Sequence, residues 1–377
     1  MSGGFEGLIV LEIADSPGAC FAGSQFADFN ADVIMCESAT GRSSMRSMGP
    51  KGWWRVLARN KRSLSLSEGE AGTAVICALF ERADLIVTDV PTAEQAKHPW
   101  LRELAHVKHK PLVAEVFPSG ADLPGMWSGD VFSESTAAVA GMMALTGEAE
   151  GAPLQPEFPL GDYLAGVLAA FRAAIALRWQ ALGGKSADSI AVPAHQALLR
   201  MIEWQIPVAT ATGRTEFRTA NAFPMDSGIS NMHLTRDGKY FAISAANQAS
   251  AVRLMKMIGG DALANDPRFA TIEARARGVA PLYEMLDQWF GERTAAEAQI
   301  AATKHDVVLG PIYDTNDILA EPHFPARHNI VEMADDDGGV IRMPGITPRI
   351  EGVETAVRHL GPSRGQDNDW IQQRFKA

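Results

Sequence analysis

The residue whose type and position best suit chemistry is Asp162, at the start of the longest apolar helical stretch in the sequence. Its neighbours from Phe158 to Ala165 are mostly small or apolar. An aspartate at such a position is most often an N-cap, which stabilises a helix by roughly 1 kcal/mol. In a dry pocket near a helix N-terminus, the same carboxylate could instead act as a nucleophile. The residues alone leave both interpretations open, and the N-cap is the commoner one.

Two other segments could bind an anion. Asp15–Ala19 (DSPGA) follows a predicted strand and opens a predicted helix, so its backbone N–H groups could receive an anion or a polar ligand. It lacks the GxGxxG spacing of dinucleotide sites, and a plain strand–helix turn is the simpler explanation. Arg59–Arg62 (RNKR) is the densest basic cluster. Such a cluster can hold phosphates, although a solvated surface is the usual explanation.

Other kinds of site have no support in the sequence. The nine histidines are scattered without metal-ligand spacing, and no serine stands in a GxSxG motif. The three cysteines, Cys20, Cys36 and Cys77, show neither a disulfide nor a zinc pattern. We therefore expect no metal and a reducing compartment.

Composition narrows the class of protein. The chain has 377 residues, of which 46% are hydrophobic and 21% charged, which is ordinary for a globular protein. A net charge of −11 without a basic block argues against nucleic acid or an anionic membrane as a partner. Met1–Gly7 is no secretory signal, and no run reaches the roughly 18 apolar residues that span a bilayer. The stretch 163–182 carries Arg172 and Arg178 and predicts a buried core helix, so we expect a cytoplasmic protein.

These residues must be positioned by an α/β fold. The first third of the chain alternates predicted strands and helices, which indicates a parallel sheet with right-handed crossovers. Residues 207–235 lack periodicity and predict a linker or an active-site loop, and a second unit follows. The predicted strands are 8–14, 32–36, 84–87, 111–117, 189–192 and 240–244, with a hairpin of 330–333 and 339–343. The predicted helices are 19–30, 68–82, 133–145, 162–182, 194–204, 249–257, 271–290, 294–303 and 369–375, with a loop over 311–325.

Several stretches together resemble the class III CoA-transferase family, which includes formyl-CoA and carnitine CoA-transferases. The resemblance covers nearly the whole chain in order, and the collinear set is more specific than any single piece. The stretches are 10–37 (VLEIADSPGACFAGSQFADFNADVIMCE), 58–66 (ARNKRSLSL), 82–90 (RADLIVTDV), 140–148 (AGMMALTGE), 160–177 (LGDYLAGVLAAFRAAIAL), 237–244 (DGKYFAIS), 265–269 (NDPRF) and 310–327 (GPIYDTNDILAEPHFPAR).

This resemblance implies an enzyme that transfers coenzyme A from an acyl-CoA to a small carboxylic acid, with Asp162 as the catalytic nucleophile. The implied intermediates are an aspartyl anhydride and an aspartyl-CoA thioester. Coenzyme A enters as a substrate, and no metal is needed. The matching positions imply contacts to coenzyme A from Pro17, Gly18, Leu66, Asp89, Val90, Lys97, Val131 and Phe132.

The sequence also departs from the family pattern. Ser38 and Asp130 stand where formyl-CoA transferase has an arginine and a lysine. Cations that could compensate are Arg42, Arg46, Lys61 or Arg62. The glycine-rich lid of that enzyme has no counterpart between residues 214 and 237, which suggests a larger or differently shaped acid. Residues that could line its pocket are Met225, Met232 and His233.

The resemblance further implies a Rossmann-like large domain and a small α/β domain in an interlocked, ring-like homodimer. The expected division is 1–206 for the large domain, 207–235 for the linker, 236–325 for the small domain and 326–377 for the return to the large domain. Two alternatives stay open: an acyl-CoA racemase or epimerase, and a subunit of a heteromeric CoA-transferase. The racemase branch pairs its aspartate with a histidine, and Phe132 occupies that position here.

Overall fold

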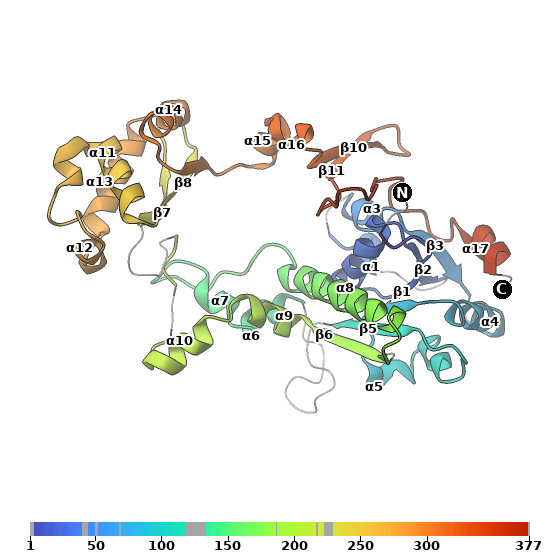
Figure 1. The fold of residues 1–377 in the computed structure, drawn as a ribbon. Helices are drawn as coiled ribbons and strands as arrows, with labels where there is room; N and C mark the ends of the chain where they lie inside the picture. Colours follow the sequence, from blue (N-terminus) through green and yellow to red (C-terminus); the bar gives the residue numbers. More distant parts are fainter. Residues whose placement is uncertain are drawn as a thin grey trace. The chain divides into compact units, whose positions relative to one another are not determined.

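The chain forms two compact units in the computed structural model (Figure 1). The first unit comprises Met1–Ala144, Leu154–Glu216 and His323–Ala377, and the second comprises Leu145–Pro153 and Phe217–Pro322. Strands and helices are present in both units, so the predicted α/β class is confirmed. The structure describes residues 4–39, 44–49, 52–67, 69–117, 133–185, 187–215, 218–221 and 229–375.

A six-stranded parallel sheet is the centre of the first unit, in the order β3-β2-β1-β4-β5-β6. The chain runs outward from β1 to one edge and from β4 to the other. In sheets of this kind ligands bind beyond the carboxyl ends of the strands, where the order reverses. The strands are β1 (Ile9–Ile13), β2 (Asp32–Ser38), β3 (Arg62–Leu66), β4 (Leu85–Thr88), β5 (Leu112–Phe117) and β6 (Ser189–Pro193).

Helices cover both faces of this sheet. Because successive strand side chains point to opposite faces, Val10 packs into the core with α1, α8 and α9, whereas Leu11 packs into the core with α4, η1 and α17. These helices are α1 (Pro17–Asp28), α4 (Glu70–Phe80), the 3₁₀ helix η1 (Leu101–Ala105), α8 (Leu160–Ala181), α9 (Ala194–Met201) and α17 (Asn368–Phe375). The shorter elements of the unit are α2 (Ser44–Ser47), α3 (Trp53–Leu57), α5 (Thr92–Gln95), α6 (Ser133–Val139), α7 (Met142–Leu145), α10 (Gln205–Thr212), α16 (His323–Ala326) and the hairpin β10 (Ile330–Ala334) and β11 (Val340–Pro344).

The closest helix packing in the unit is between α1 and α8, which lie side by side in Figure 1. A Cβ atom on Gly18 would lie 2.8 Å from the carbonyl oxygen of Asp162, and one on Gly166 would lie 2.4 Å from the carbonyl oxygen of Gly18. Both neighbours are backbone atoms, so they cannot rotate away. The missing side chains therefore allow the first turns of the two helices to touch.

The second unit has a three-stranded antiparallel sheet in the order β7-β8-β9, packed against helices. Its core contains Phe241, Leu254, Leu286 and Phe290, all fully or almost fully buried. The elements are β7 (Ile229–Leu234), β8 (Tyr240–Ala245), α11 (Gln248–Ala264), α12 (Ile272–Arg277), α13 (Ala280–Gly291), α14 (Ala295–His305), β9 (Leu309–Pro311) and α15 (Thr315–Ala320).

Two predicted helices are each divided in the structure. The helix expected over 133–145 is interrupted at Gly141, whose φ of 88° is left-handed, and it forms α6 and α7 instead. The helix expected over 271–290 forms α12 and α13, with Gly278 at the end of α12. In both places the apolar periodicity of the sequence continues across a glycine, Gly141 or Gly278, whose backbone is not helical.

Two segments predicted to be irregular contain regular structure. The loop expected over 311–325 contains α15, which begins with a capping box between Asp314 and Asp317. The linker expected over 207–235 includes most of α10 and strand β7. β7 has the polar sequence ISNMHL, and its pairing with β8 forms a strand that the pattern did not predict.

Helix α8 meets the length and hydropathy criteria for a membrane-spanning helix, alone among the helices in the described part of the chain. Its best 18-residue window has a mean hydropathy of 1.5. Core helices often meet the same criteria. α8 buries Ala165, Gly166, Ala169 and Ala173 against its own unit, in agreement with the predicted core helix.

The α1–α8 contact gives a stability prediction. Gly166→Ala is expected to lower the free energy of unfolding by about 1–3 kcal/mol, because the new Cβ meets the backbone of α1. Gly291→Ala at the end of α13 is the matched control, since nothing lies within 4 Å of its Cβ position. There the same change should be neutral or slightly stabilising. Urea unfolding followed by circular dichroism measures both, and equal stability of the two variants would contradict the packing described.

Candidate active site

The loop after β1 brings polar groups to the carboxyl edge of the sheet. Ser16 is the N-cap of α1, and its side chain accepts a hydrogen bond from the backbone N–H of Ala19. The backbone N–H of Asp15 donates to the Asp89 carboxylate at 2.7 Å, which joins the loops after β1 and β4. The first turn of α1 therefore lies at the point where the strand order reverses, and its dipole favours an anion there.

Asp162 is the third residue of α8 and is 3% exposed. The N-cap position belongs to Pro159, so the commoner interpretation of Asp162 as an N-cap is wrong. The contact between Gly18 and the Asp162 backbone sets this residue against the first turn of α1. Asp162 therefore lies in the first turn of α8, with its backbone carbonyl against the first turn of α1.

Aromatic side chains surround the residue that follows. The Tyr163 ring lies 4.3 Å from the Phe21 ring, and its hydroxyl accepts a hydrogen bond from Trp53 Nε1 at 2.7 Å. Burial raises the pKa of Tyr163, so its hydroxyl stays protonated at neutral pH. Gly49 has a φ of 73°, and a Cβ there would lie 2.0 Å from the Trp53 ring. The Trp53 indole therefore lies between the backbone of Gly49 and the hydroxyl of Tyr163.

A cavity of about 330 Å³ opens next to this cluster at the carboxyl edge of the sheet. It reaches Pro17 at the start of α1 and Leu160 and Gly161, which directly precede Asp162. We call it the acyl cavity. Its full lining among the described residues is Pro17, Met48, Trp53, Ala137, Gln155, Pro156, Glu157, Phe158, Pro159, Leu160 and Gly161.

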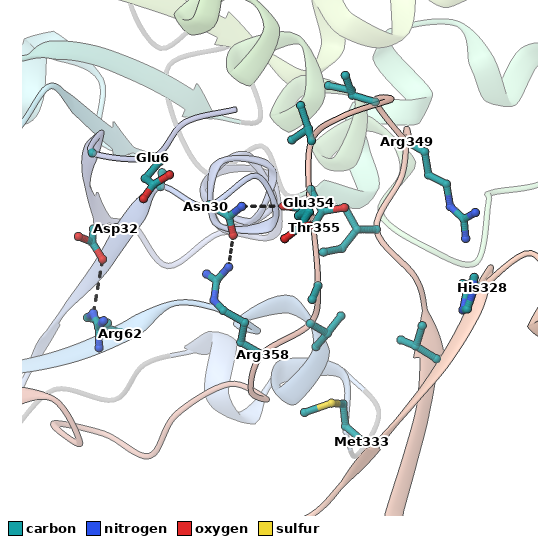
Figure 2. Close-up of a pocket in the computed structure, with 18 of the residues that line it drawn as sticks. Glu6, Asn30, Asp32, Arg62, His328, Met333, Arg349, Glu354, Thr355 and Arg358 are labelled. Carbon is teal, nitrogen blue, oxygen red and sulfur yellow. Dashed lines mark hydrogen bonds and ion pairs between the residues drawn. The ribbon is translucent and has the colours of Figure 1, made fainter. Parts of the chain in front are cut away.

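A larger cavity of about 1160 Å³ lies at the opposite end of α1, by the amino ends of β1 and β2 (Figure 2). There Asn30 donates to the carbonyl oxygen of Glu354 at 2.9 Å and accepts from Arg358. Arg62 faces Asp32 at 3.7 Å. These contacts tie the C-terminal segment to the first unit, and the cavity lies at the edge of the sheet away from Asp162.

The basic segment 59–62 is structural. Arg59 forms a two-pronged ion pair with Asp28, at 3.0 and 2.6 Å. Lys61 is 0% exposed, and its Nζ bonds Glu12 at 2.7 Å and the Cys20 carbonyl oxygen at 2.6 Å. Arg62 stacks on Trp370, with 3.7 Å between the guanidinium carbon and the ring centre. Arg59 and Lys61 are therefore held in ion pairs inside the fold, and Lys61 cannot compensate for a missing cation.

Of the other cations suggested to compensate, one is paired with a carboxylate and one lies outside the described residues. Arg46 binds both Glu37 oxygens at 2.6 Å and lies over the Trp54 ring. Arg42, like Asp130, lies outside the described residues. Ser38 ends β2 opposite Leu66, as the register of the two strands requires.

The residues implied for coenzyme A are distributed along the carboxyl edge. Pro17 and Gly18 are buried in the first turn of α1, and Leu66 is the buried last residue of β3. Asp89 and Val90 follow β4 and are half-buried, while Lys97 is exposed beyond α5. Val131 and Phe132 lie outside the described residues.

Two of the three side chains suggested for the acid pocket lie in the second unit. His233 is buried in the second unit, where it stacks on Phe290 and bonds Asp287 at 2.6 Å. Met232 neighbours it on β7, and Met225 lies outside the described residues. In the described part of the chain, no three His, Cys, Asp or Glu side chains gather as metal ligands do.

Sequence reasoning missed the Trp53–Tyr163 pair and Glu12–Lys61. Each joins residues far apart in the chain, by 110 and 49 positions. The sequence does contain a glycine at each close approach, Gly49 beside Trp53 and Gly23 beside Glu12. A Cβ atom at Gly23 would lie 1.9 Å from Glu12 Oε2. Such glycines mark close approaches, but the sequence does not say which side chain approaches them.

Comparisons with known proteins agree with this architecture. The profile of the family described as "CoA-transferase family III" matches residues 5–368. Succinyl-CoA–D-citramalate CoA-transferase of Chloroflexus aurantiacus is 32% identical over 369 residues, covering 95% of this chain and 90% of the relative. Succinate–glutarate CoA-transferase of Agrobacterium fabrum is 25% identical, covering 95% and 92%. A CaiB/BaiF family protein of Brucella suis has a similar fold, with a TM-score of 0.84 at 22% identity and full coverage of both chains.

The site also gives a prediction on pH and stability. Burial raises the pKa of Asp89 from 3.8 to about 6, and the hydrogen bond from Asp15 offsets this only in part. Between these values the folded state holds a proton that the unfolded state has lost, so the free energy of unfolding falls as the pH rises through this window. Asp89→Asn should therefore raise stability on the order of 1 kcal/mol at about pH 8, and less at about pH 5.

Thermal denaturation at the two pH values measures this difference. Asp337→Asn, at an exposed position in the turn of the β10–β11 hairpin, is the control and should show no pH-dependent gain. Equal gains for Asp89→Asn at both pH values would contradict a raised pKa.

Proposed function

This chain belongs to CoA-transferase family III, and from that premise we propose that it moves coenzyme A between an acyl-CoA and a carboxylic acid through covalent intermediates on Asp162. The observation that carries the proposal is the position of Asp162. Asp162 is buried in the first turn of α8, and its backbone carbonyl lies against Gly18 in the first turn of α1. The residue before it, Gly161, lines the acyl cavity.

The proposed sequence balances at each step. The Asp162 carboxylate attacks the thioester carbonyl, the C–S bond breaks, and an anhydride and the CoA thiolate form. The thiolate attacks the aspartyl carbonyl of the anhydride, which releases the donor acid and leaves an aspartyl-CoA thioester. The acceptor carboxylate attacks that thioester, giving a second anhydride and the thiolate. The thiolate then attacks the acceptor's acyl carbonyl, and free Asp162 is restored.

Three physical demands of this sequence match features of the site. The nucleophile must be ionised, which the two helix N-termini favour. Negative charge on the carbonyl oxygen must meet fixed donors. In the first turn of α1 the backbone N–H of Gly18 suits this role, since Pro17 has no N–H and that of Ala19 is bonded to Ser16. Water must be excluded, because it would hydrolyse the anhydride, and Asp162 is only 3% exposed. This low exposure also means that side chains around the acyl cavity must shift when the thioester reaches Asp162.

We place coenzyme A along the carboxyl edge of the sheet. Leu66 ends β3, and Asp89 and Val90 follow β4, with β2 and β1 between these two strands. An extended ligand that lies along this edge can therefore contact all three residues. The exposed ammonium group of Lys97 suits a phosphate at the outer end of that ligand. The thiol end then points to Pro17 and Gly18, beside Asp162.

The racemase alternative requires two groups that exchange a proton on opposite faces of the α-carbon. Phe132 stands at the position of the required histidine, and the sequence has no histidine between His109 and His195. Loss of the α-proton to solvent deuterium, without any second acid, would favour that alternative.

We also propose that the enzyme is a homodimer in which α8 contributes to the contact. Val167, Phe171, Ile175 and Trp179 recur every four residues and are 44–62% exposed. An apolar stripe of this length on the outer face of a core helix suits burial against a second copy of the chain. A heteromeric enzyme is the alternative, since two relatives are named as the alpha and beta subunits of succinyl-CoA–L-malate CoA-transferase.

Asp162→Asn tests the mechanism. The amide is nearly the same size but cannot form the anhydride, so CoA exchange should fall by about 10³-fold or more. Intact mass spectrometry after incubation with an acyl-CoA should show a covalent CoA adduct on the wild type and none on the variant. Asp188→Asn, at an exposed position in the same unit, should retain both exchange and adduct. Substantial exchange by Asp162→Asn would exclude Asp162 as the nucleophile.

Phe171→Glu tests the assembly. A charge in the middle of the α8 stripe should shift the molar mass in light scattering from twice the chain mass of 40.5 kDa toward the single chain. Ile300→Glu, at a 70% exposed apolar residue of α14, is the control and should leave the mass unchanged. A monomeric wild type would refute the homodimer, and activity of the purified chain alone would exclude an obligatory second subunit.

A further inference from the structure

The walls of the acyl cavity are formed mainly by apolar side chains. Trp53 and Phe158 contribute aromatic rings, and Met48 and Leu160 contribute flexible aliphatic chains. Pro17, Ala137, Pro156, Pro159 and Gly161 complete the apolar surface. The rings of Phe158 and Trp53 both approach Tyr163, at 5.5 and 6.5 Å between centres. An acyl chain that enters this cavity therefore meets apolar surface that extends to Gly161, the residue before Asp162.

The charge in the cavity has one sign. Among the described lining residues, the only ionisable side chain is Glu157, and Gln155 is the only other polar one. A second carboxylate on the acyl group would leave water for an apolar wall and would face a like charge. Both effects disfavour it, because apolar contact removes water from the carboxylate and Glu157 repels it.

The size of the cavity also limits the acyl group. Its volume of about 330 Å³ is near the lower end for small-molecule sites and roughly twice that of an apolar cavity that holds benzene. A branched or aromatic acyl group fits this space together with the reacting thioester carbonyl.

From these walls, this charge and this volume we infer that the enzyme selects monocarboxylic acids with an uncharged apolar body, and rejects dicarboxylic acids. The inference rests on the proposed function and narrows its substrate class. It distinguishes this chain from the relatives reported above, whose names give succinate, glutarate and citramalate as substrates. Met48 and Glu157 are the positions that determine this selectivity.

Identity exchange tests the inference one acid at a time. Each acyl-CoA is mixed with its own isotope-labelled free acid, and label in the thioester reports both halves of the reaction. Isocaproyl-CoA is the apolar probe, because an isopropyl group replaces the second carboxylate of succinyl-CoA, the dicarboxylic probe. We expect kcat/KM for isocaproate exchange to exceed that for succinate by about 100-fold or more.

Met48→Arg places a cation in the cavity wall at a residue that is 40% exposed, so the change should be tolerated by the fold. It should lower the isocaproate-to-succinate ratio by about tenfold or more, mainly by raising succinate exchange. The matched control is Met201→Arg, at a 52% exposed position at the end of α9 outside the acyl cavity, and it should leave the ratio unchanged.

The outcomes separate this inference from the proposed function. Succinate exchange as fast as isocaproate exchange in the wild type, or an unchanged ratio in Met48→Arg, overturns the inference but supports CoA transfer. A covalent CoA adduct that forms from succinyl-CoA in preference to isocaproyl-CoA does the same. No adduct and no exchange with either donor overturns the proposed function and this inference with it.

Discussion

The contact between the first turns of α1 and α8 is the constraint on which the site depends. Gly18 and Gly166 each leave a space that the backbone of the other helix fills, so the two N-termini lie together over the reversal point of the sheet. This arrangement places Asp162 beside the loop after β1, in the electrostatic field of both helices. Substituents at these glycines would separate the helices and move the carboxylate away from the donors of α1.

A buried ion pair joins α1 to the central sheet. Lys61 on the segment before β3 reaches Glu12 on β1 and the Cys20 carbonyl oxygen on α1. Burial raises the pKa of Glu12, and the adjacent ammonium group partly offsets this effect. Breaking such a pair leaves one charge without a partner in the core, which is costly. The basic segment that resembles the family's NKRSL stretch therefore stabilises the helix that supports the site, rather than binding phosphate.

The sequence predicted the parts of the molecule that depend on local pattern. Buried strands such as Leu112–Phe117 and the long helix containing Asp162 have strong signals, and the structure contains them. β7 was missed because its partner strand, not its own polar residues, determines its conformation. Asp162 emerged as a nucleophile only through the family resemblance, because an aspartate early in a helix is usually structural. The pairing of Trp53 with Tyr163 joins two distant segments, and no local pattern contains that information.

In the proposed mechanism, the residues for chemistry are separate from those for selectivity. Asp162 and the glycines around it belong to helices packed on the central sheet, and their positions follow from the core. Met48 and the residues 155–159 belong to connecting segments, which can change without disturbing that core. A family can therefore keep one reaction on one fold while its members accept different acids.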